Sequence, residues 1–312
     1  MSIDVSKQVK DITYNGMPLI LSGSGGSGEP LVTIGGFVPE ALDGEGYIMS
    51  GSWYGSILPA GVFGSAQYMR ANTRIIDVRL PNNLTTIGAN AFYRCFNLAL
   101  TLLPSSVTSI GARAFEECYN LALESLPNGL TSIGSNAFGS CEKLALTYLP
   151  NSITSIGSRG FYYCKNLALT SLPTRLTEID SQTFEGCEKL ALTVLPYGVT
   201  YIGGYAFNGC KNLALISLPA GVTHIMESAF VDCEKLAITS IPANVTYIGD
   251  YAFARCKKLT SITFKGTPTS VGTSIFNGCS NLTTINVPWA NGAVAGAPWG
   301  ATNATINYNY TV

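Results

Sequence analysis

Apolar and polar residues recur along most of this chain with a period of 23 residues. Prolines mark the period from Pro81 to Pro242, and all nine cysteines follow it from Cys95 to Cys279. A Phe stands three residues before each Cys, and a Leu stands three residues after it. One such unit cannot bury its own apolar side, whereas stacked units can. The pattern therefore predicts a solenoid of nine repeats over residues 81–288.

The repeating unit reads LALTxLPxxVTSIGxxAFxxCxN, and each part predicts a local structure. LALTxLP predicts a short strand that ends at proline, which has no N–H to donate to a sheet. VTSIG predicts a second extended piece, whose Gly is expected to free the backbone for a turn. AFxxC predicts one short helical or 3₁₀ turn with Phe and Cys on one side. The expected fold class is an α/β repeat solenoid of short parallel strands.

The motif AFxxCxxL…LPxxVTxIG resembles the BspA-like leucine-rich repeat, over about Leu80 to Pro288. The resemblance implies a leucine-rich-repeat arc with helical or 3₁₀ turns on its convex side. It also implies an extracellular or surface-exposed protein that mediates adhesion and protein recognition. The usual strand of the family is LxxIxLP, as in Leu282, Ile285, Val287 and Pro288 of this chain.

The central repeats have Thr where that family has Ile, and this leaves two orientations open for one column of side chains. Strict alternation places the column on the concave face, whereas a local bulge turns it into the core. The column consists of Leu100, Leu123, Leu146, Leu169, Leu192, Leu215 and Ile238.

Solenoids need atypical units to cover their terminal cores. Residues 57–80 align as a degenerate capping repeat, with Met69 in the Phe place, Asn72 in the Cys place and Ile75 in the Leu place. Residues 289–312 predict a C-terminal capping strand. Its expected inward face consists of Ile306, Tyr308, Tyr310 and Val312.

Residues 1–56 predict a separate N-terminal module. Asn15-Gly16 suits the type I′ turn of a hairpin, and residues 22–30 have the Gly/Ser composition of a linker. The first residues lack the apolar stretch of a signal peptide. This organisation, together with the C-terminal tail, resembles phage tail or prophage-encoded fibre proteins. That resemblance implies an oligomeric, virion-associated component.

Composition narrows the choice of partners. Charged residues make up 12% of the chain, its net charge is −1, and its charges form no basic run. This argues against nucleic acid and against anionic membranes as partners. No apolar run is long enough to span a bilayer. The expected partner is a protein or a glycan, and a homo-oligomer is possible.

The cysteines predict a buried structural ladder in which Cys acts as a small apolar residue. Zinc sites need clustered ligands, and no two cysteines here are closer than 23 residues. Stacked side chains point in parallel, and their number is odd, so disulfides are not expected. No metal or cofactor is expected either. The ladder consists of Cys95, Cys118, Cys141, Cys164, Cys187, Cys210, Cys233, Cys256 and Cys279.

A column of alternating charge follows the cysteines and predicts ion pairs between repeats. It consists of Glu142, Lys165, Glu188, Lys211, Glu234 and Lys257.

Two surfaces are candidates for binding. Aromatic residues at stacked positions of the C-terminal repeats suit contact with a carbohydrate or a protein. They are Tyr197, Tyr201, Tyr205, His224, Tyr247 and Tyr251. A rival column on the expected concave face consists of Leu102, Ser125, Tyr148, Ser171, Val194, Ser217 and Ser240.

The most favoured function is a non-enzymatic binding or adhesion protein that presents its repeat surface to a protein or glycan. An oligomeric phage-fibre component is the alternative. An enzyme is a third, disfavoured hypothesis, because the only histidine is His224, in a variable column, and no residues form a catalytic constellation.

Overall fold

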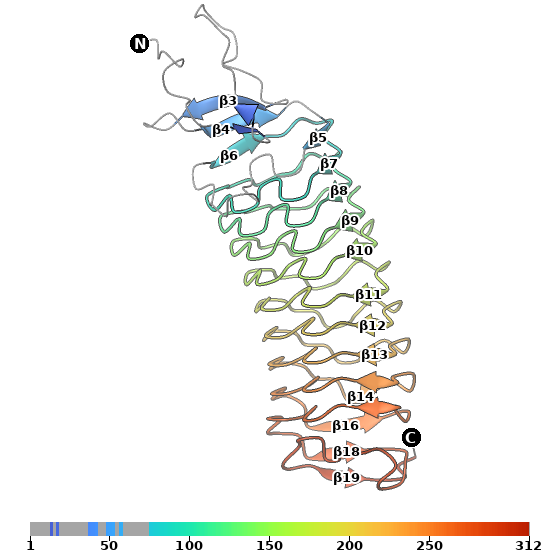
Figure 1. Ribbon diagram of the computed structural model, residues 1–312. Helices are drawn as coiled ribbons and strands as arrows, with labels where there is room; N and C mark the ends of the chain where they lie inside the picture. The colour runs from blue at the N-terminus through green and yellow to red at the C-terminus, as the bar shows by residue number, and fades with distance from the viewer. Residues whose placement is uncertain are drawn as a thin grey trace, which may run out of the picture.

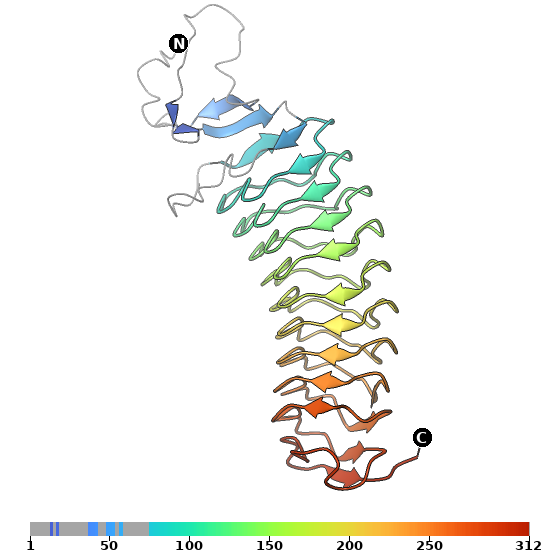
Figure 2. The same cartoon turned by 45° about the vertical axis from the view of Figure 1, so that its right-hand side comes forward.

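The computed structural model describes residues 13–14, 17–18, 37–42, 48–53, 56–58 and 75–311. These residues form a gently curved rod of stacked coils, with the N-terminal strands at one end and the C terminus at the other (Figure 1). Each repeat makes one coil, and the short strands of successive coils stack along the rod (Figure 2). The predicted parallel solenoid is therefore confirmed.

The main strand column comes from the VTSIG segments. Its strands pair in parallel and in register, so that Tyr201 lies opposite His224, and they form two sheets with the orders β10-β9-β8-β7-β5 and β11-β12-β13-β15-β17. The last residue of each strand from Leu58 to Ile248 is buried, and the residue before it faces outward. The strands are β5 (Ile57–Leu58), β7 (Thr86–Ile87), β8 (Ser109–Ile110), β9 (Ser132–Ile133), β10 (Ser155–Ile156), β11 (Glu178–Ile179), β12 (Tyr201–Ile202), β13 (His224–Ile225), β15 (Tyr247–Ile248) and β17 (Ser270–Val271).

The equivalent segment of the degenerate first repeat contains β6 (Asp77–Arg79), but from Leu98 onward the LALTxLP segments form strands only near the C terminus. There, β14 (Ser240–Ile241), β16 (Ser261–Phe264), β18 (Thr284–Asn286) and β19 (Thr305–Asn307) make a parallel sheet in that order. In the coils from Leu98 to Pro219, the prediction of a strand is wrong, because the backbone bends within the segment.

The bend settles the orientation of the undecided leucine column. Leu146 and Leu149 are both buried, while Thr147 and Tyr148 between them face solvent. Two consecutive outward residues interrupt the alternation, as a local bulge would. All seven residues of the column, from Leu100 to Ile238, are buried in the core. The chain therefore has no exposed stripe of these leucines.

The AFxxC segments are not helical, so the predicted helical or 3₁₀ turns are wrong: within the described residues there is no helix. Every second N–H of the segment bonds to the next coil, as when Phe138 N donates to Gly160 O at 2.9 Å. The intervening groups form turns within the coil, as when Cys141 N donates to Phe138 O at 3.1 Å. An α-helix needs all of these groups for its own hydrogen bonds.

This alternation places two residues per coil in the left-handed region of the backbone. Asn136 and Ser140 have φ of 55° and 60°, and Gly186 and Gly209 occupy the Ser140 position in two later coils. The non-glycine residues in this conformation include Asn90, Arg94, Arg113, Glu117, Asn136, Ser140, Arg159, Tyr163, Gln182, Tyr205, Ser228, Asp232, Tyr251, Arg255 and Ser274.

The glycine of VTSIG has a different role from the one expected. Gly203 lacks a left-handed φ, and a Cβ added to it would lie 2.5 Å from the backbone nitrogen of Ser181 in the preceding coil. Glycine is therefore needed there for the close approach of two backbones, not for the freedom of a turn.

The core is built from ladders that run along the rod. The Phe rings stack from coil to coil, with centroids 5.1 Å apart between Phe92 and Phe115 and interplanar angles as small as 3°. All nine cysteines are free and buried beside them. Each thiol from Cys118 to Cys279 also donates a hydrogen bond to the Phe carbonyl of the preceding coil.

The N-terminal end carries strands of another kind. β3 (Phe37–Leu42) pairs antiparallel with β4 (Ile48–Trp53), which pairs in parallel with β6 (Asp77–Arg79). β1 (Thr13–Tyr14) pairs antiparallel with β2 (Met17–Pro18), at the place where a hairpin is predicted. Residues 15–16, the linker 22–30, Met69 and Asn72 lie outside the described residues, and the predicted domain boundaries stay predictions.

The C-terminal end is closed by aromatic packing. Trp299 is buried, its ring centroid lying 6.3 Å from that of Trp289 and 5.8 Å from that of Phe264. The predicted closing strand is shorter than expected, because only Thr305–Asn307 pairs with β18. Tyr310 is exposed, and Val312 lies outside the described residues. Trp299 lies 23 residues after Phe276 and so continues the period of the Phe column, a signal that the prediction of a closing strand did not use.

Candidate functional site

Three aromatic residues form a ladder on the sheet of β12, β13 and β15, with His224 exposed and Tyr201 and Tyr247 half-buried. The strand register places Tyr201, His224 and Tyr247 side by side. The ring centroids of Tyr201 and His224 are 6.2 Å apart, and those of His224 and Tyr247 are 6.0 Å apart. The strands fix this arrangement because the next residue of each, an Ile, is anchored in the core. The structure thus brings together three of the six aromatic residues singled out from the sequence.

The ladder lies in an acidic environment. Partial burial raises the pKa of the Tyr201 hydroxyl, and the carboxylates of Asp180 and Glu178 raise it further. Burial, and then the charge of Glu178, raises the pKa of Asp180. Carboxylates are strong acceptors for the hydroxyl or N–H groups of a ligand. The ladder therefore combines ring surfaces with acceptor oxygens.

A column of threonines stiffens the backbone beside the ladder. Thr223 Oγ1 donates to Thr200 O at 3.1 Å, and Thr246 Oγ1 donates to Thr223 O at 3.2 Å. Thr223 Oγ1 also lies 2.9 Å from His224 Nδ1. Six other threonines of this column, the first Thr85 and the last Thr269, bond in the same way to the preceding coil. The rings therefore project from a regular, hydrogen-bonded surface.

The other aromatic candidates lie apart from this ladder. Tyr205 and Tyr251 sit in the turn after the strand, with φ of 58° and 56°, and Ser228 occupies their column between them. Tyr197 is 86% exposed, directly after Pro196. Among the described residues, no ring contact joins these three tyrosines to the ladder.

The rival column forms a second exposed surface. Leu102, Tyr148 and Val194 are 60%, 48% and 51% exposed and recur in every second coil. The serines at the same position fill the intervening coils, so the column alternates between apolar and polar side chains. The sequence reasoning missed Ile216, which is also 60% exposed. The sequence does contain an indication of this residue, because Ile216 replaces the Thr of the LALT motif.

The thiols, the histidine and the carboxylates of the described residues are not arranged for covalent or metal chemistry. Burial raises the pKa of the thiols, such as Cys187, which keeps them protonated. His224 contacts a threonine hydroxyl and two tyrosine rings. Across the part of the chain that the structure describes, no three His, Cys, Asp or Glu side chains gather into a metal site. The described residues also contain no helix that is long and apolar enough to cross a membrane.

A solved structure shares this fold, and two others are similar to parts or most of the chain at lower TM-scores. A leucine-rich repeat protein from Bacteroides ovatus is similar with a TM-score of 0.62 and 22% identity, over 88% of this chain and 74% of that chain. A leucine-rich repeat protein of T. pallidum matches with a TM-score of 0.46 and 29% identity, over 53% of this chain and 78% of that chain. A leucine rich cell surface protein from Faecalibacterium prausnitzii matches with a TM-score of 0.43 and 21% identity, over 92% of this chain and 97% of that chain. Comparison with curated proteins gives no match.

A family model supports the same assignment from the sequence. The model for the BspA type leucine rich repeat region matches residues 65–191 and 177–294, with six copies of its unit. These ranges cover most of the chain, including every coil from the first buried Phe to the last cysteine. The chain therefore belongs to the BspA type leucine-rich-repeat family.

Proposed function

We propose that this protein is a non-enzymatic recognition protein that presents its strand face to a protein or glycan partner on a cell surface. The observation that carries the proposal is the ladder of Tyr201, His224 and Tyr247, whose outward side chains are reached by solvent. Stacked side chains on a sheet lose little conformational freedom on binding, because their backbone and rotamers are already restrained. Tyrosine adds a large apolar ring with a polar tip, which suits both classes of partner.

Membership of a repeat family supports this function more than an enzymatic one. A solenoid provides a long, rigid surface, and binding is the use that this geometry favours. The cell-surface description of the F. prausnitzii protein is in keeping with the proposal. The phage-fibre alternative stays a prediction from the sequence.

Removal of the ladder tests the proposal. Full-length protein and the Tyr201→Ala/Tyr247→Ala variant are passed over immobilised glycans and extracellular-matrix proteins. The matched control is Ser109→Ala/Ser155→Ala, which changes the same position on β8 and β10. A partner that the wild type and the control retain, and that the tyrosine variant loses by about tenfold or more, supports the proposal. Equal retention of all three proteins at unchanged melting temperature overturns it.

A further inference from the structure

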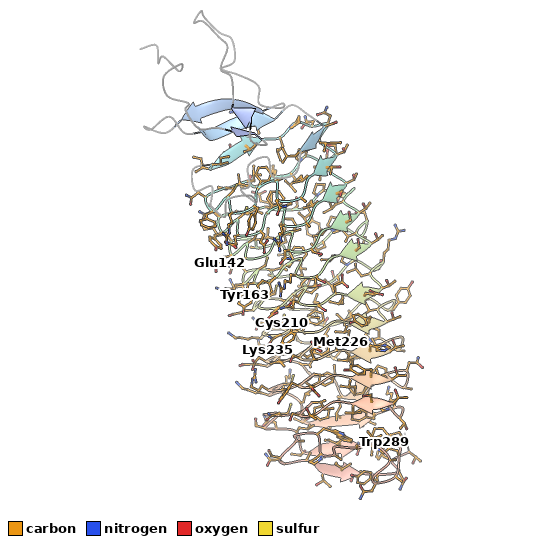
Figure 3. The ribbon with its side chains drawn as sticks, viewed as in Figure 1. Glu142, Tyr163, Cys210, Met226, Lys235 and Trp289 are labelled. Carbon is orange, nitrogen blue, oxygen red and sulfur yellow. The ribbon has the colours of Figure 1, made fainter. Side chains whose placement is uncertain are left out.

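The side of the coil formed by the LALTxLP segments carries a second regular surface, away from the aromatic ladder. In each segment, two or three Leu side chains point into the core, and the side chains of the residues between them point outward. In the stretch from Glu142 to Tyr148, the outward residues are two charged ones, Glu142 and Lys143, followed by Ala145, Thr147 and Tyr148. Figure 3 shows Glu142 and Lys235 on the edge of the stack opposite the strand column near Met226.

The glutamates of this edge are neutralised by lysines of the next coil. Lys165 Nζ lies 2.9 Å from a Glu142 oxygen. The same pairing joins Lys211 to Glu188 at 3.1 Å and Lys257 to Glu234 at 2.9 Å. The alternating charge column predicted from the sequence therefore forms inter-coil ion pairs, as expected.

A second set of lysines is left uncompensated. Lys143, Lys189 and Lys235 are exposed, and none of their ammonium groups has an ion pair or hydrogen bond within the described residues. These three recur every 46 residues, which is every second coil, and asparagines fill the coils between them. Lys258, in the coil directly after Lys235, is a fourth exposed lysine of the same column. Between Lys143 and Lys235 the edge thus presents one free positive charge per two coils.

Apolar side chains follow the same two-coil period. Leu102, Tyr148 and Val194 are exposed at the other end of the segment. Between them and the lysines runs a column of alanines, one per coil, which are only partly covered: Ala99, Ala122, Ala145, Ala168, Ala191, Ala214 and Ala237. A linear ligand above the alanines would meet ammonium groups on one side and apolar groups on the other.

The spacing of the free lysines along the rod favours one class of linear ligand over others. Adjacent coils are separated by the strand spacing of about 4.8 Å, so the free charges recur at about 9.6 Å. An extended peptide repeats its same-side groups at roughly 6.7 Å, and a nucleic acid strand carries a charge about every 3.4 Å. A disaccharide is close to two coils in length. Its sugar rings also offer apolar faces to side chains such as Tyr148.

We propose that this edge binds a linear anionic polysaccharide that lies along the rod, with one acidic sugar per disaccharide placed at each free lysine. The acidic sugars face Lys143, Lys189 and Lys235, while neutral sugars lie over the intervening coils. The proposal does not depend on the aromatic ladder, which lies on a different segment of each coil.

Binding of three probes to the full chain tests the charge spacing. Hyaluronan oligosaccharides carry one carboxylate per disaccharide, whereas oligogalacturonates of equal length carry one per monosaccharide, and oligo(dT) carries closely spaced phosphates. Register-matched binding predicts about fivefold or greater preference for hyaluronan, although it has the lowest charge density. Equal or tighter binding of either denser polyanion, or no binding of hyaluronan, overturns the proposal.

Two double variants test the lysines at equal change of net charge. Lys189→Gln/Lys235→Gln should weaken hyaluronan binding by about tenfold, since each removes one exposed charge pair. Arg175→Gln/Lys265→Gln, which removes two other exposed cations, should change it by less than about twofold. An equal loss in both variants would show a non-specific effect of net charge and refute the assignment. Tyr201→Ala/Tyr247→Ala should bind hyaluronan as the wild type does.

Discussion

The thiol of Cys187 donates a hydrogen bond to the backbone carbonyl of Phe161 in the preceding coil, over an Sγ···O distance of 3.1 Å. The same carbonyl accepts the N–H of Cys164 at 3.1 Å. Both lone pairs of the oxygen are therefore used, one within its coil and one between coils. The interpretation of cysteine as a small apolar residue is incomplete, because the thiol is also a specific donor at this position.

Replacement of one thiol should separate the contribution of packing from that of hydrogen bonding. Cys187→Ala is expected to destabilise the protein by about 1–2 kcal/mol, because it leaves a small void and removes one donor. Cys187→Ser should cost less than Cys187→Ala, since its hydroxyl can still donate to Phe161. The measurement is urea unfolding followed by circular dichroism. A serine variant less stable than the alanine variant would contradict a role for the hydrogen bond.

The thiols should also make the fold sensitive to alkali. Burial raises the pKa of all nine thiols above their ordinary value of 9.0, and raises that of Cys279 to about 11. Below about pH 9 both the folded and unfolded chains keep these protons. Above it, the unfolded chain loses protons that the folded chain retains, so stability falls as the pH rises.

The expected slope is about 1.4 kcal/mol per pH unit for each thiol that is protonated only in the folded state. Urea unfolding at pH values between about 8 and 10 measures it. The Cys187→Ala variant is the control, and its slope should be smaller by one thiol's share. A free energy of unfolding that stays constant over this range would rule out the linkage.

The cost in stability of a left-handed backbone position can be measured by comparing two glycine variants. Gly209 has a φ of 74°, and a Cβ added to it would meet its nearest atom at 3.7 Å, which is an ordinary contact. Gly209→Ala should therefore cost about 1–2 kcal/mol through backbone conformation alone. Gly129 lacks a left-handed φ and has open space around it, so Gly129→Ala should be neutral or slightly stabilising. Equal melting temperatures of the two variants would refute this explanation.

Two types of inter-coil ion pair should differ in strength. Arg255 holds Asp232 through two hydrogen bonds of 2.6 Å, and this contact lowers the pKa of Asp232 below its ordinary value of 3.8. Double-mutant cycles should give a coupling of about 0.5–1 kcal/mol for this pair and less for Glu142 and Lys165, which share a single contact. The Asp232 contribution is present above its ordinary pKa and is lost as the pH falls below it. Equal coupling in the two cycles would contradict the importance of the two-bond geometry.

The residues that face the core could be predicted where each repeat keeps the same residue type. Phe138 and Cys141 recur in every coil because one ring and one thiol fill each layer of the ladder. Tyr201, His224 and Tyr247 could likewise be placed side by side, since their common period puts them on neighbouring strands. The orientation of Leu146 could not be predicted, because it depends on a backbone bend that the LALT pattern does not encode.

The conformation of the AFxxC turns could not be predicted from the sequence either. Its left-handed positions are occupied by residues as different as Asn136, Arg159 and Tyr163, so residue type gives no common signal. The competing principle is inter-coil hydrogen bonding, which diverts every second N–H from the helical pattern suggested by AFxxC. Tyr205 and Tyr251 belong to these turns and therefore lie on a different segment of the coil from the ladder.

The hydrogen bonds between coils run in opposite directions on different sides of the rod. On the turn side, the N–H of Phe92 points toward the next coil and bonds to Ala114, whereas on the strand side the N–H of Thr108 points back to Thr85. The peptide dipoles of the two sides therefore oppose each other, unlike those of an α-helix, which add along its axis. Coils added to such a rod therefore build up less charge at its tips than turns added to an α-helix. Evolution can consequently lengthen or shorten the molecule by whole repeats with little electrostatic effect at either end.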